Sequence, residues 1–147
     1  MWDYITEEQI ALFSLIFGRP PFDIGGIDWH YTGSWIISAH LNRTINIWEI
    51  DDEIINRIKN KEKTGKSIRK GCPNYECSEL HSNFIDNVKF YGDLVVSKDS
   101  DEKIIIWCPF EEDVFALNSF YLPLFEKIWF DNLLCINNIN YFIGLHK

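Results

Sequence analysis

No apolar run in the 147-residue sequence is long enough to cross a membrane as a helix, and the nearest candidate, Ile10–Phe17, is too short. Cysteine is scarce, and its spacing shows no dense disulfide framework. No secretory leader is recognisable at the start. We therefore expect no membrane-spanning segment, and reduced thiols in a reducing compartment. The four cysteines are Cys72, Cys77, Cys108 and Cys135.

Positive charge is in deficit: 14 Lys and Arg residues stand against 22 Asp and Glu residues, for a net charge of −8. This deficit argues against a general nucleic-acid binder. Apolar residues make up 46% of the chain and aromatic residues 16%, which is enough for a core and unlike a disordered chain. The length suits one domain or part of a larger one.

Long periodic helices are also missing. Short runs rich in Ile, Val, Trp and Phe alternate with turn residues, as is typical of strands. Gly33-Ser34 and Gly92-Asp93 stand where hairpin turns are expected. The sequence therefore predicts an all-β fold of short antiparallel strands. The clearest predicted strands are Ile27–Tyr31, Trp35–Ser38, Thr44–Trp48, Ile85–Phe90, Leu94–Ser97 and Lys103–Trp107.

One segment, "TEEQIALFSLIF" at 6–17, fits either a helix or a strand. Thr6 and Gln9 have the spacing of a capping box, which indicates a helix start. The nearly continuous apolar residues from Ile10 to Phe17 fit a buried strand. We favour the strand because the surrounding segments are strands.

The chain repeats itself. "SAHLNRTINIW" at 38–48 and "SKDSDEKIIIW" at 97–107 share a serine, an Asp or Asn four residues later, and Ile-x-Ile-Trp. Trp2-Asp3 has the closing dipeptide of a third copy that is cut off at the start. Self-similarity at this period indicates a propeller or another repeat array, in which each blade buries its faces only against its neighbours. The alignment pairs Trp48 with Trp107, Ile45 with Ile104, Asn42 with Asp101, Ser38 with Ser97 and Gly33 with Gly92, and also pairs Ile27 and Trp29 with Val88 and Phe90 once a two-residue difference in the turn is allowed.

The shared pattern resembles the end of a WD repeat. In that family a His, a Ser, an Asp and the Trp form hydrogen bonds across each blade. In the second copy the resemblance places these roles on His81, Ser97, Asp101 and Trp107. The chemistry is reasonable, because a buried indole N–H is only a donor and needs an acceptor.

The first copy matches the WD pattern less completely. It has Ser38, Asn42 and Trp48, but no histidine at the place that matches His81. We therefore expect the first blade to be the looser of the two.

A longer stretch of sequence resembles one particular family of WD-repeat proteins. "LHSNFIDNVKFYGDLVVSK" at 80–98 resembles a late repeat of the embryonic ectoderm development (EED/ESC) family of Polycomb repressive complex 2. Residues 10–19 and 25–50 are similar to the repeat before it, and residues 127–135 resemble the opening of the repeat after it. The segments follow the family's order and cover nearly the whole chain.

The resemblance implies a partial WD-repeat β-propeller. The family closes a ring of seven blades, whereas this chain has about two full four-stranded blades, which leaves sheet faces and edges open. We expect either a fragment of a longer protein or a ring that another chain completes. The predicted units are 1–24 (end of a preceding blade and linking strand), 25–58 (first WD repeat), 59–80 (basic inter-blade loop), 81–122 (second WD repeat) and 123–147 (start of an incomplete blade).

Trp129 and Phe130 are the candidate binding residues. By resemblance they fall on two members of the aromatic cage with which the family binds trimethyl-lysine in a histone tail. A quaternary ammonium group cannot donate hydrogen bonds, so an aromatic box holds it by cation–π attraction. The family has Tyr where this chain has Phe130, so the ring face is kept and the hydroxyl is lost. The alternative is that both are core residues at a strand start.

A basic run follows the first repeat. A solvated loop is the simplest interpretation, and weak contact with nucleic acid or an acidic partner is the alternative. "NKEKTGKS" at 60–67 ends like a phosphate-binding loop, but Asn60 replaces the first glycine, and the motif needs a strand before it and a helix after it. The basic residues are Lys59, Lys61, Lys63, Lys66, Arg69 and Lys70.

Metal and catalytic sites have little support. Cys72, Cys77 and His81 have loosely permissive zinc spacing but no evident fourth ligand, so we expect no metal. Catalysis needs groups that converge on a cleft, and no Ser-His-Asp or Cys-His arrangement is indicated. We therefore expect neither an enzyme nor a cofactor. The remaining histidines, interpreted as surface or turn residues, are His30, His40 and His146.

Two functional hypotheses follow. The resemblance implies a non-catalytic scaffold and reader subunit of a nuclear Polycomb-type histone methyltransferase complex, whose partners would be the catalytic subunit and a trimethyl-lysine histone tail. The alternative is a generic WD-repeat interaction module, or a truncated fragment without a histone role, because WD folds serve many unrelated functions.

Overall fold

The computed structural model describes residues 1–3, 7–14, 23–61, 65–109 and 116–121. Strands dominate this part of the chain, and all six predicted strands are present with small shifts at their ends. The all-β fold class is therefore confirmed. The elements in chain order are β1 (Trp2–Asp3), β2 (Glu8–Gln9), β3 (Ala11–Phe13), β4 (Ile24–Trp29), β5 (Trp35–His40), β6 (Ile45–Glu49), α1 (Asp52–Asn60), β7 (Ile68–Lys70), β8 (Tyr75–Cys77), β9 (Ile85–Tyr91), β10 (Leu94–Asp99), β11 (Lys103–Trp107) and β12 (Ala116–Tyr121).

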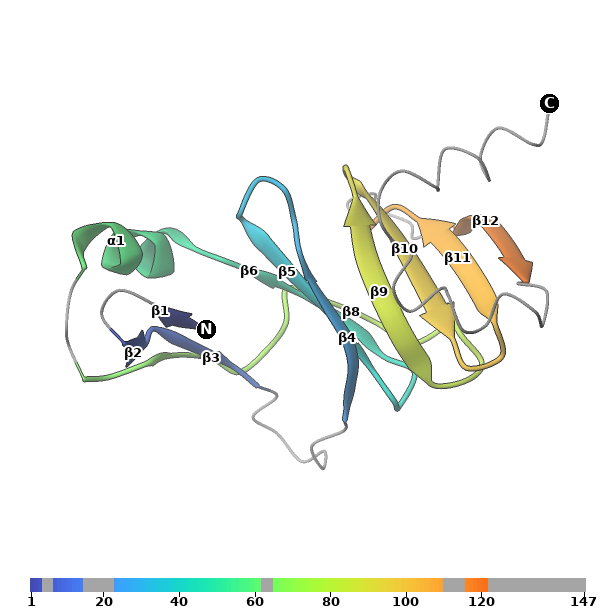
Figure 1. Cartoon of the computed structure of the whole chain (residues 1–147), viewed down its shortest axis with the longest axis horizontal. Helices are drawn as coiled ribbons and strands as arrows, with labels where there is room; N and C mark the ends of the chain where they lie inside the picture. Colours follow the sequence, from blue (N-terminus) through green and yellow to red (C-terminus); the bar gives the residue numbers. More distant parts are fainter. Residues whose placement is uncertain (4–6, 15–22, 62–64, 110–115, 122–147) are drawn as a thin grey trace.

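Two four-stranded antiparallel sheets form the centre of the molecule, and each is one blade (Figure 1). The first blade has the strand order β4-β5-β6-β8, and the second has β9-β10-β11-β12. Their registers agree with the sequence repeat, because Ser38 pairs with Ile27 in the first blade and Ser97 pairs with Val88 in the second.

The hairpins of both blades turn at equivalent residues. Gly33 and Gly92 have positive φ values of 78° and 62°, which glycine adopts without a Cβ clash. They lie in the β4–β5 and β9–β10 turns, as the sequence predicts. In the next turn of each blade, Arg43 and Glu102 have φ values of 72° and 66°. The repeat therefore extends to the backbone conformation of the turns.

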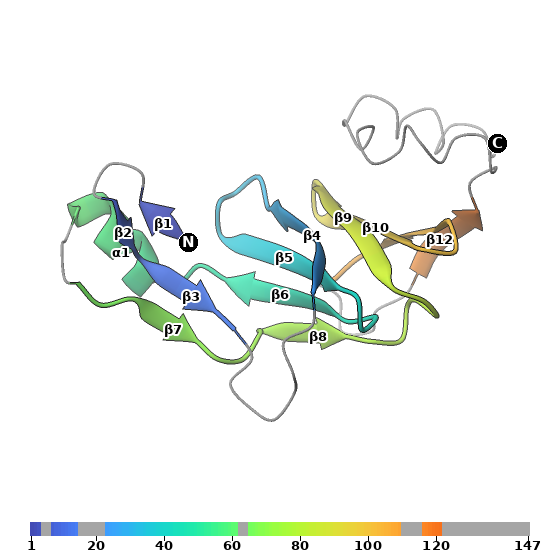
Figure 2. The ribbon, with the colours of Figure 1, turned by 60° about the horizontal axis from the view of Figure 1, so that its bottom comes forward.

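The two blades pack face to face, with β9 lying against β4 and β5 (Figure 2). This contact depends on small residues in β4. A Cβ atom at Gly25 would overlap the Ile85 carbonyl oxygen, and one at Gly26 would lie 3.0 Å from Val88 N. Burial of apolar side chains between the blades supplies the main stabilisation. The buried residues of this core are Ile37, Ala39, Ile45, Ile47, Ile85, Val88, Phe90, Val95, Ile105 and Trp107.

The N-terminal strands and α1 cover part of the opposite face of the first blade. β1 pairs with β2, and β3 pairs in parallel with β7. The strand interpretation of the ambiguous segment is therefore confirmed for Ala11–Phe13, while residues 15–17 lie outside the described part. Trp2 is 68% exposed, so it does not close a blade as Trp48 and Trp107 do. This second core contains Ile10, Ala11, Ile36, Trp48, Ile50 and Ile54.

Residues 52–60 form a helix that the sequence reading missed. Asp51 caps its start by accepting a hydrogen bond from Ile54 N at 3.2 Å, and Lys61 ends it in the left-handed conformation. Ile54 is fully buried, which anchors the helix to the second core. Such a short helix is stabilised mainly by packing, because isolated helices of this length are marginal.

The segment predicted as an inter-blade loop, 59–80, includes two strands. β7 pairs with β3, and β8 pairs with β6 as the fourth strand of the first blade. Each of these strands has three residues, too few to show a period in the sequence. None of the helices in the described part is long and apolar enough to traverse a membrane.

Candidate functional site

The second blade contains a buried hydrogen-bond relay that links Trp107, Ser97, His81 and Asp99. Trp107 Nε1–H donates to Ser97 Oγ at 3.2 Å, and Ser97 Oγ lies 2.7 Å from His81 Nε2. His81 Nδ1 lies 2.8 Å from Asp99 Oδ2. A carboxylate only accepts, so Nδ1 carries the proton and Nε2 accepts from the serine hydroxyl. The relay ties the turn before β9 to β10 and β11.

The acid of this relay is Asp99, and the prediction of Asp101 is wrong. Asp99 is completely buried, and its Oδ1 also accepts from the backbone N–H groups of Asp101 and Lys103 at 3.0 and 3.1 Å. Asp101 is exposed in the following turn, where it accepts from Asn83 Nδ2 at 2.9 Å. Strand residues two apart share a face, which places Asp99 beside Ser97.

His81 is neutral in this site. Burial lowers its pKa, and this effect outweighs Asp99, which acts in the opposite direction. The neutral ring matches the hydrogen bonds, since Nε2 accepts and Nδ1 donates. Both ring nitrogens are therefore engaged, which leaves neither for a zinc ion with Cys72 and Cys77. Within the described residues, no three His, Cys, Asp or Glu side chains are grouped for a metal ion.

The first blade builds its relay from different residues. Trp48 Nε1–H donates to Ser38 Oγ at 3.1 Å, and Ser38 Oγ lies 3.0 Å from His40 Nε2. Asn46 Nδ2 lies 3.2 Å from the same nitrogen. The blade therefore does have a histidine, at the repeat position of Asp99. Because His40 does not stand at the place that matches His81, the WD pattern alone does not indicate it.

Asn42 is not part of that relay. Its Oδ1 accepts from the backbone N–H of Thr44 at 3.2 Å and from the Thr44 hydroxyl at 2.7 Å, so it shapes the β5–β6 turn. His30 was interpreted as a surface or turn residue; it does begin the β4–β5 turn, where its carbonyl accepts from Gly33 N at 2.9 Å, but it is not at the surface, because only 4% of the residue is exposed. The centroid of the His30 ring lies 4.8 Å from the centroid of the Phe90 ring, across the blade junction. His146 lies outside the described residues.

A polar link also crosses the blade junction. Asp28, on β4, accepts from Phe90 N at 2.8 Å through Oδ2 and from Lys89 Nζ at 3.2 Å through Oδ1. Charge-assisted hydrogen bonds of this kind are stronger than neutral ones. Asp28 therefore fixes the position of β9 along β4.

The loop that leads into β9 exposes a small surface of mixed chemistry. Phe84 is 53% exposed, and Asp86 Oδ2 accepts from the buried Lys98 Nζ at 2.8 Å. The other oxygen, Asp86 Oδ1, is buried and has no hydrogen-bond partner in the described part of the chain. The aromatic ring of Phe84 is therefore the exposed feature of this loop, while Asp86 Oδ1 and the Lys98 side chain are buried.

The basic run is divided between the end of α1 and the segment that follows it. Lys59 and Lys61 lie at the end of α1, Lys66 and Arg69 are exposed on the segment that follows, and Lys63 lies outside the described residues. Lys70 forms an ion pair with Asp51, which lowers the pKa of that carboxyl group.

The elements around 60–67 do not have the order that a phosphate-binding loop requires, in agreement with the sequence analysis. Here helix α1 precedes the motif and strand β7 follows it, which is the reverse of the required order. The loop therefore places no helix N-terminus against a phosphate.

Trp129 and Phe130, the candidate cage residues, lie outside the described residues. The relays in the described blades hold the strands together and expose no reactive group to a cleft. Since the relay serine, histidine and tryptophan are all deeply buried in the second blade, the relay is structural.

Comparison with known proteins gives consistent relatives, although no family model matches the chain. Polycomb protein esc of Drosophila virilis is 25% identical over 118 residues, which is 74% of this chain and 28% of the relative. Polycomb protein EED of Chaetomium thermophilum is 32% identical over 110 residues, 73% of this chain and 18% of the relative. Polycomb group protein FIE1 of Oryza sativa subsp. japonica is 26% identical over 147 residues, 92% of this chain and 31% of the relative.

Solved structures agree on the fold. The crystal structure of the Chaetomium thermophilum polycomb repressive complex 2 contains a chain that matches 74% of this one with a TM-score of 0.53 and 22% identity. The match covers 22% of that chain. This chain thus spans less than a third of the length of the relatives and structures it matches. The expectation of a non-catalytic WD-repeat chain agrees with these matches. Over most of its length, the chain is homologous to the Polycomb proteins ESC, EED and FIE and corresponds to part of their WD-repeat propeller.

Proposed function

We propose that the chain acts as a non-catalytic scaffold and reader in a nuclear Polycomb-type histone methyltransferase complex. The observation that carries this proposal is the homology to ESC, EED and FIE over most of the chain. A structure of the Chaetomium complex with H3K27me3 and H3K27M has the same fold match, with a TM-score of 0.53. The partners of this chain would be a catalytic methyltransferase subunit and a trimethyl-lysine histone tail.

The proposed roles differ between the two parts of the chain. Trp129 and Phe130 would supply two faces of the cage for the quaternary ammonium group. The exposed basic residues Lys59, Lys61 and Arg69 would add weak contacts with nucleic acid or an acidic partner. No catalytic step is assigned to this chain, since methyl transfer would belong to the partner.

A chimera tests the proposal directly. The matching segment of the Chaetomium EED protein would be replaced by this chain, and binding of an H3K27me3 peptide and of its unmethylated counterpart would be measured by fluorescence polarisation. We expect the trimethylated peptide to bind at least about tenfold more tightly, the scale of roughly 1–2 kcal/mol of cation–π and apolar contact. Trp129→Ala should remove that preference, whereas Lys61→Ala should retain it.

The alternative function makes a different prediction for the same chimera. A WD interaction module without a histone role would still fold and co-purify with the catalytic subunit, but it would bind both peptides equally. A chimera that assembles without methyl-lysine preference would therefore overturn the reader role and leave the scaffold role.

A further inference from the structure

The segment that leads into β7 and forms it, residues 65–70, presents the hydroxyl group of Ser67 between basic side chains. Lys66 directly precedes Ser67, and Arg69 follows it by two residues. Lys66 and Arg69 are exposed, and Ser67 is half-buried. Within the described part of the chain, the Ser67 hydroxyl forms no hydrogen bond, so it makes no contact that a modification would break.

The two sides of β7 have different tasks. Ile68 packs against the second core, and Lys70 forms its ion pair with Asp51. Successive side chains of a strand point to opposite faces, so Arg69 points to the other side. The same alternation places Ser67, the residue before the strand, on the side of Arg69. The structural contacts of β7 are therefore separate from the side that carries the serine and the arginine.

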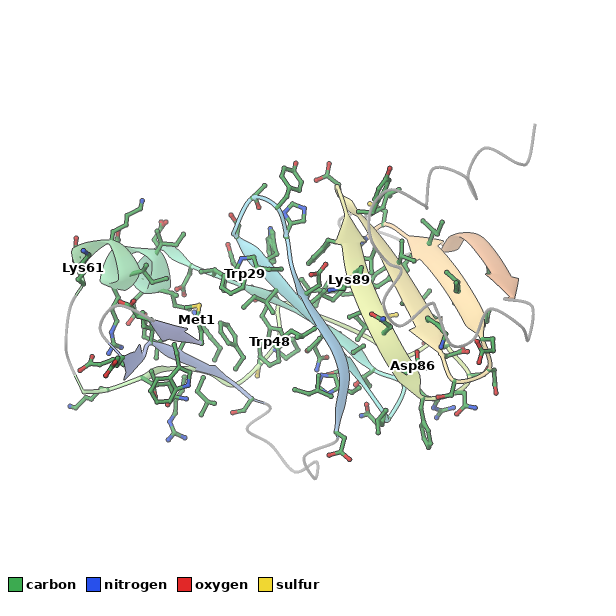
Figure 3. All side chains as sticks on the ribbon, in the orientation of Figure 1. Met1, Trp29, Trp48, Lys61, Asp86 and Lys89 are labelled. Atoms are coloured by element: carbon green, nitrogen blue, oxygen red, sulfur yellow. The ribbon has the colours of Figure 1, made fainter. Side chains whose placement is uncertain are left out.

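Positive charge is concentrated in this part of an acidic chain. Residues 59–70 contain six basic residues and one acidic residue, a net charge of +5, so the rest of the chain carries −13. Figure 3 shows Lys61 at the end of α1 that lies away from both blades, and Figure 2 shows β7 at the border of the molecule beside β3. Ser67 therefore lies in a local positive potential that an acidic binding cleft can recognise.

Other hydroxyl groups of the described residues lack this combination. Ser38 and Ser97 are buried and accept hydrogen bonds from indole N–H groups. Thr44 also has a basic neighbour, but only 5% of it is exposed. Ser100 is exposed, but an aspartate stands on each side of it. Ser67 combines accessibility with basic neighbours on both sides.

We propose that Ser67 is a phosphorylation site for a protein kinase that selects basic residues around the acceptor hydroxyl. Carboxylates of the kinase bind Lys66 and Arg69 through charge-assisted hydrogen bonds. Ser67 Oγ then forms a bond to the γ-phosphorus of ATP while the hydroxyl proton passes to the catalytic aspartate of the kinase. The bond between the γ-phosphorus and the β–γ bridging oxygen breaks, and ADP leaves. This site does not depend on the proposed histone function.

The phosphate changes the surface charge and leaves the packing of β7 in place. It carries a charge of about −1.5 to −2 at neutral pH, which offsets most of the charge of Lys66 and Arg69. Because Ser67 and Arg69 share a side of the chain, the guanidinium group can donate two parallel hydrogen bonds to the phosphate. The modification therefore weakens the attraction of this segment for other acidic groups.

Phosphorylation of the full chain in vitro tests the site. The chain is incubated with Mg²⁺, ATP and the catalytic domain of protein kinase C, and the modified residues are located and quantified by mass spectrometry. We expect Ser67 to be the main site. Arg69→Gln should lower the initial rate at least about tenfold through loss of a charge-assisted contact, and Arg69→Lys should restore most of it. Lys59→Gln removes an exposed charge outside residues 65–70 and should leave the rate nearly unchanged.

Thr44 shows whether the chain is folded during the reaction, because its basic neighbour makes it a substrate once it becomes exposed. Phosphate on Ser67 with Thr44 unmodified supports the proposal. Phosphate on Ser67 only in molecules that also carry phosphate on Thr44 overturns it, since the site would then exist only in the unfolded chain. Transfer to Thr64 in place of Ser67, no transfer to either residue, or equal rates for the unmodified chain and Arg69→Gln overturns it as well.

Discussion

Replacing Asp99 tests the assignment of the acid in the second-blade relay. Asp99→Ala removes the acceptor for His81 Nδ1–H and for the backbone N–H groups of Asp101 and Lys103, all in a residue with 0% exposure. A buried donor left unsatisfied costs about 1–3 kcal/mol, although water can enter the site and recover part of that. We expect a net loss of about 3 kcal/mol in the free energy of unfolding.

Urea unfolding of the chain, followed by circular dichroism, measures this loss. With a slope of about 2 kcal/mol/M, the midpoint should fall by about 1.5 M for Asp99→Ala. The matched control is Asp101→Ala, which removes a carboxylate of the same type two residues away. Since that side chain is exposed and its carboxylate accepts from Asn83 Nδ2 at the surface, its midpoint should shift by less than about 0.3 M. Equal shifts in the two variants, or a larger shift for Asp101→Ala, would refute the assignment.

Three further predictions concern other parts of the fold. Folding lowers the pKa of His81, so at a pH below its ordinary pKa of about 6.5 the unfolded chain binds more protons than the folded chain. The free energy of unfolding should therefore decline as the pH falls below about 6.5. Urea midpoints at pH 5.5 and 7.5 measure this decline. Gly25→Ala should destabilise the chain by roughly 2 kcal/mol or more in the same assay, because the added Cβ overlaps the Ile85 carbonyl oxygen. Asp51→Ala should cost about 1 kcal/mol through loss of the α1 cap at Ile54, detected as faster amide exchange in the helix.

Each of these changes has a control within the chain. His81→Gln should flatten the pH dependence of the midpoint relative to the unmodified chain, and an unchanged slope would contradict the His81 assignment. Gly65→Ala meets no atom within 4 Å, so only its φ of +64° penalises it, by about 1 kcal/mol. Asp52→Ala stays within the first turn of α1 but leaves the cap, and it should have the smaller effect on amide exchange.

The blades were predictable because their signal is repeated and local. Alternating Ile and Trp residues mark β6 and β11, and Gly33 and Gly92 mark the turns. The repeat also fixed the equivalence of Ile27 with Val88, which the strand registers confirm.

The relay chemistry was only partly predictable. Trp107, Ser97 and His81 were placed by the repeat pattern, but the acid was assigned four residues after the serine instead of two. Two-residue spacing along a strand would have indicated both Asp99 and His40, since each shares a face with its serine. His30 was missed because a single histidine in a turn gives no periodic signal of burial.

Elements held by distant contacts were not predictable. The nine residues of α1 do carry local helix signals, since Asp51 is a capping residue and acidic residues precede basic ones along the helix. The strands β7 and β8 have three residues each, too few to show a period, and they pair with β3 and β6 far away in the chain. Their local sequences are compatible with loops, and tertiary contacts decide the outcome.

The parallel pairing of β3 with β7 sets the order in which the chain is completed during synthesis. Ala11 pairs with Ile68, a separation of 68 − 11 = 57 residues, and all of β4, β5, β6 and α1 lie between them. At about 5–20 residues per second, the ribosome needs roughly 3–11 seconds to supply the second strand after the first. During that interval β3 has an unpaired edge on the nascent chain. β3 is therefore synthesised before the four intervening elements, yet it is paired only after all of them have been made.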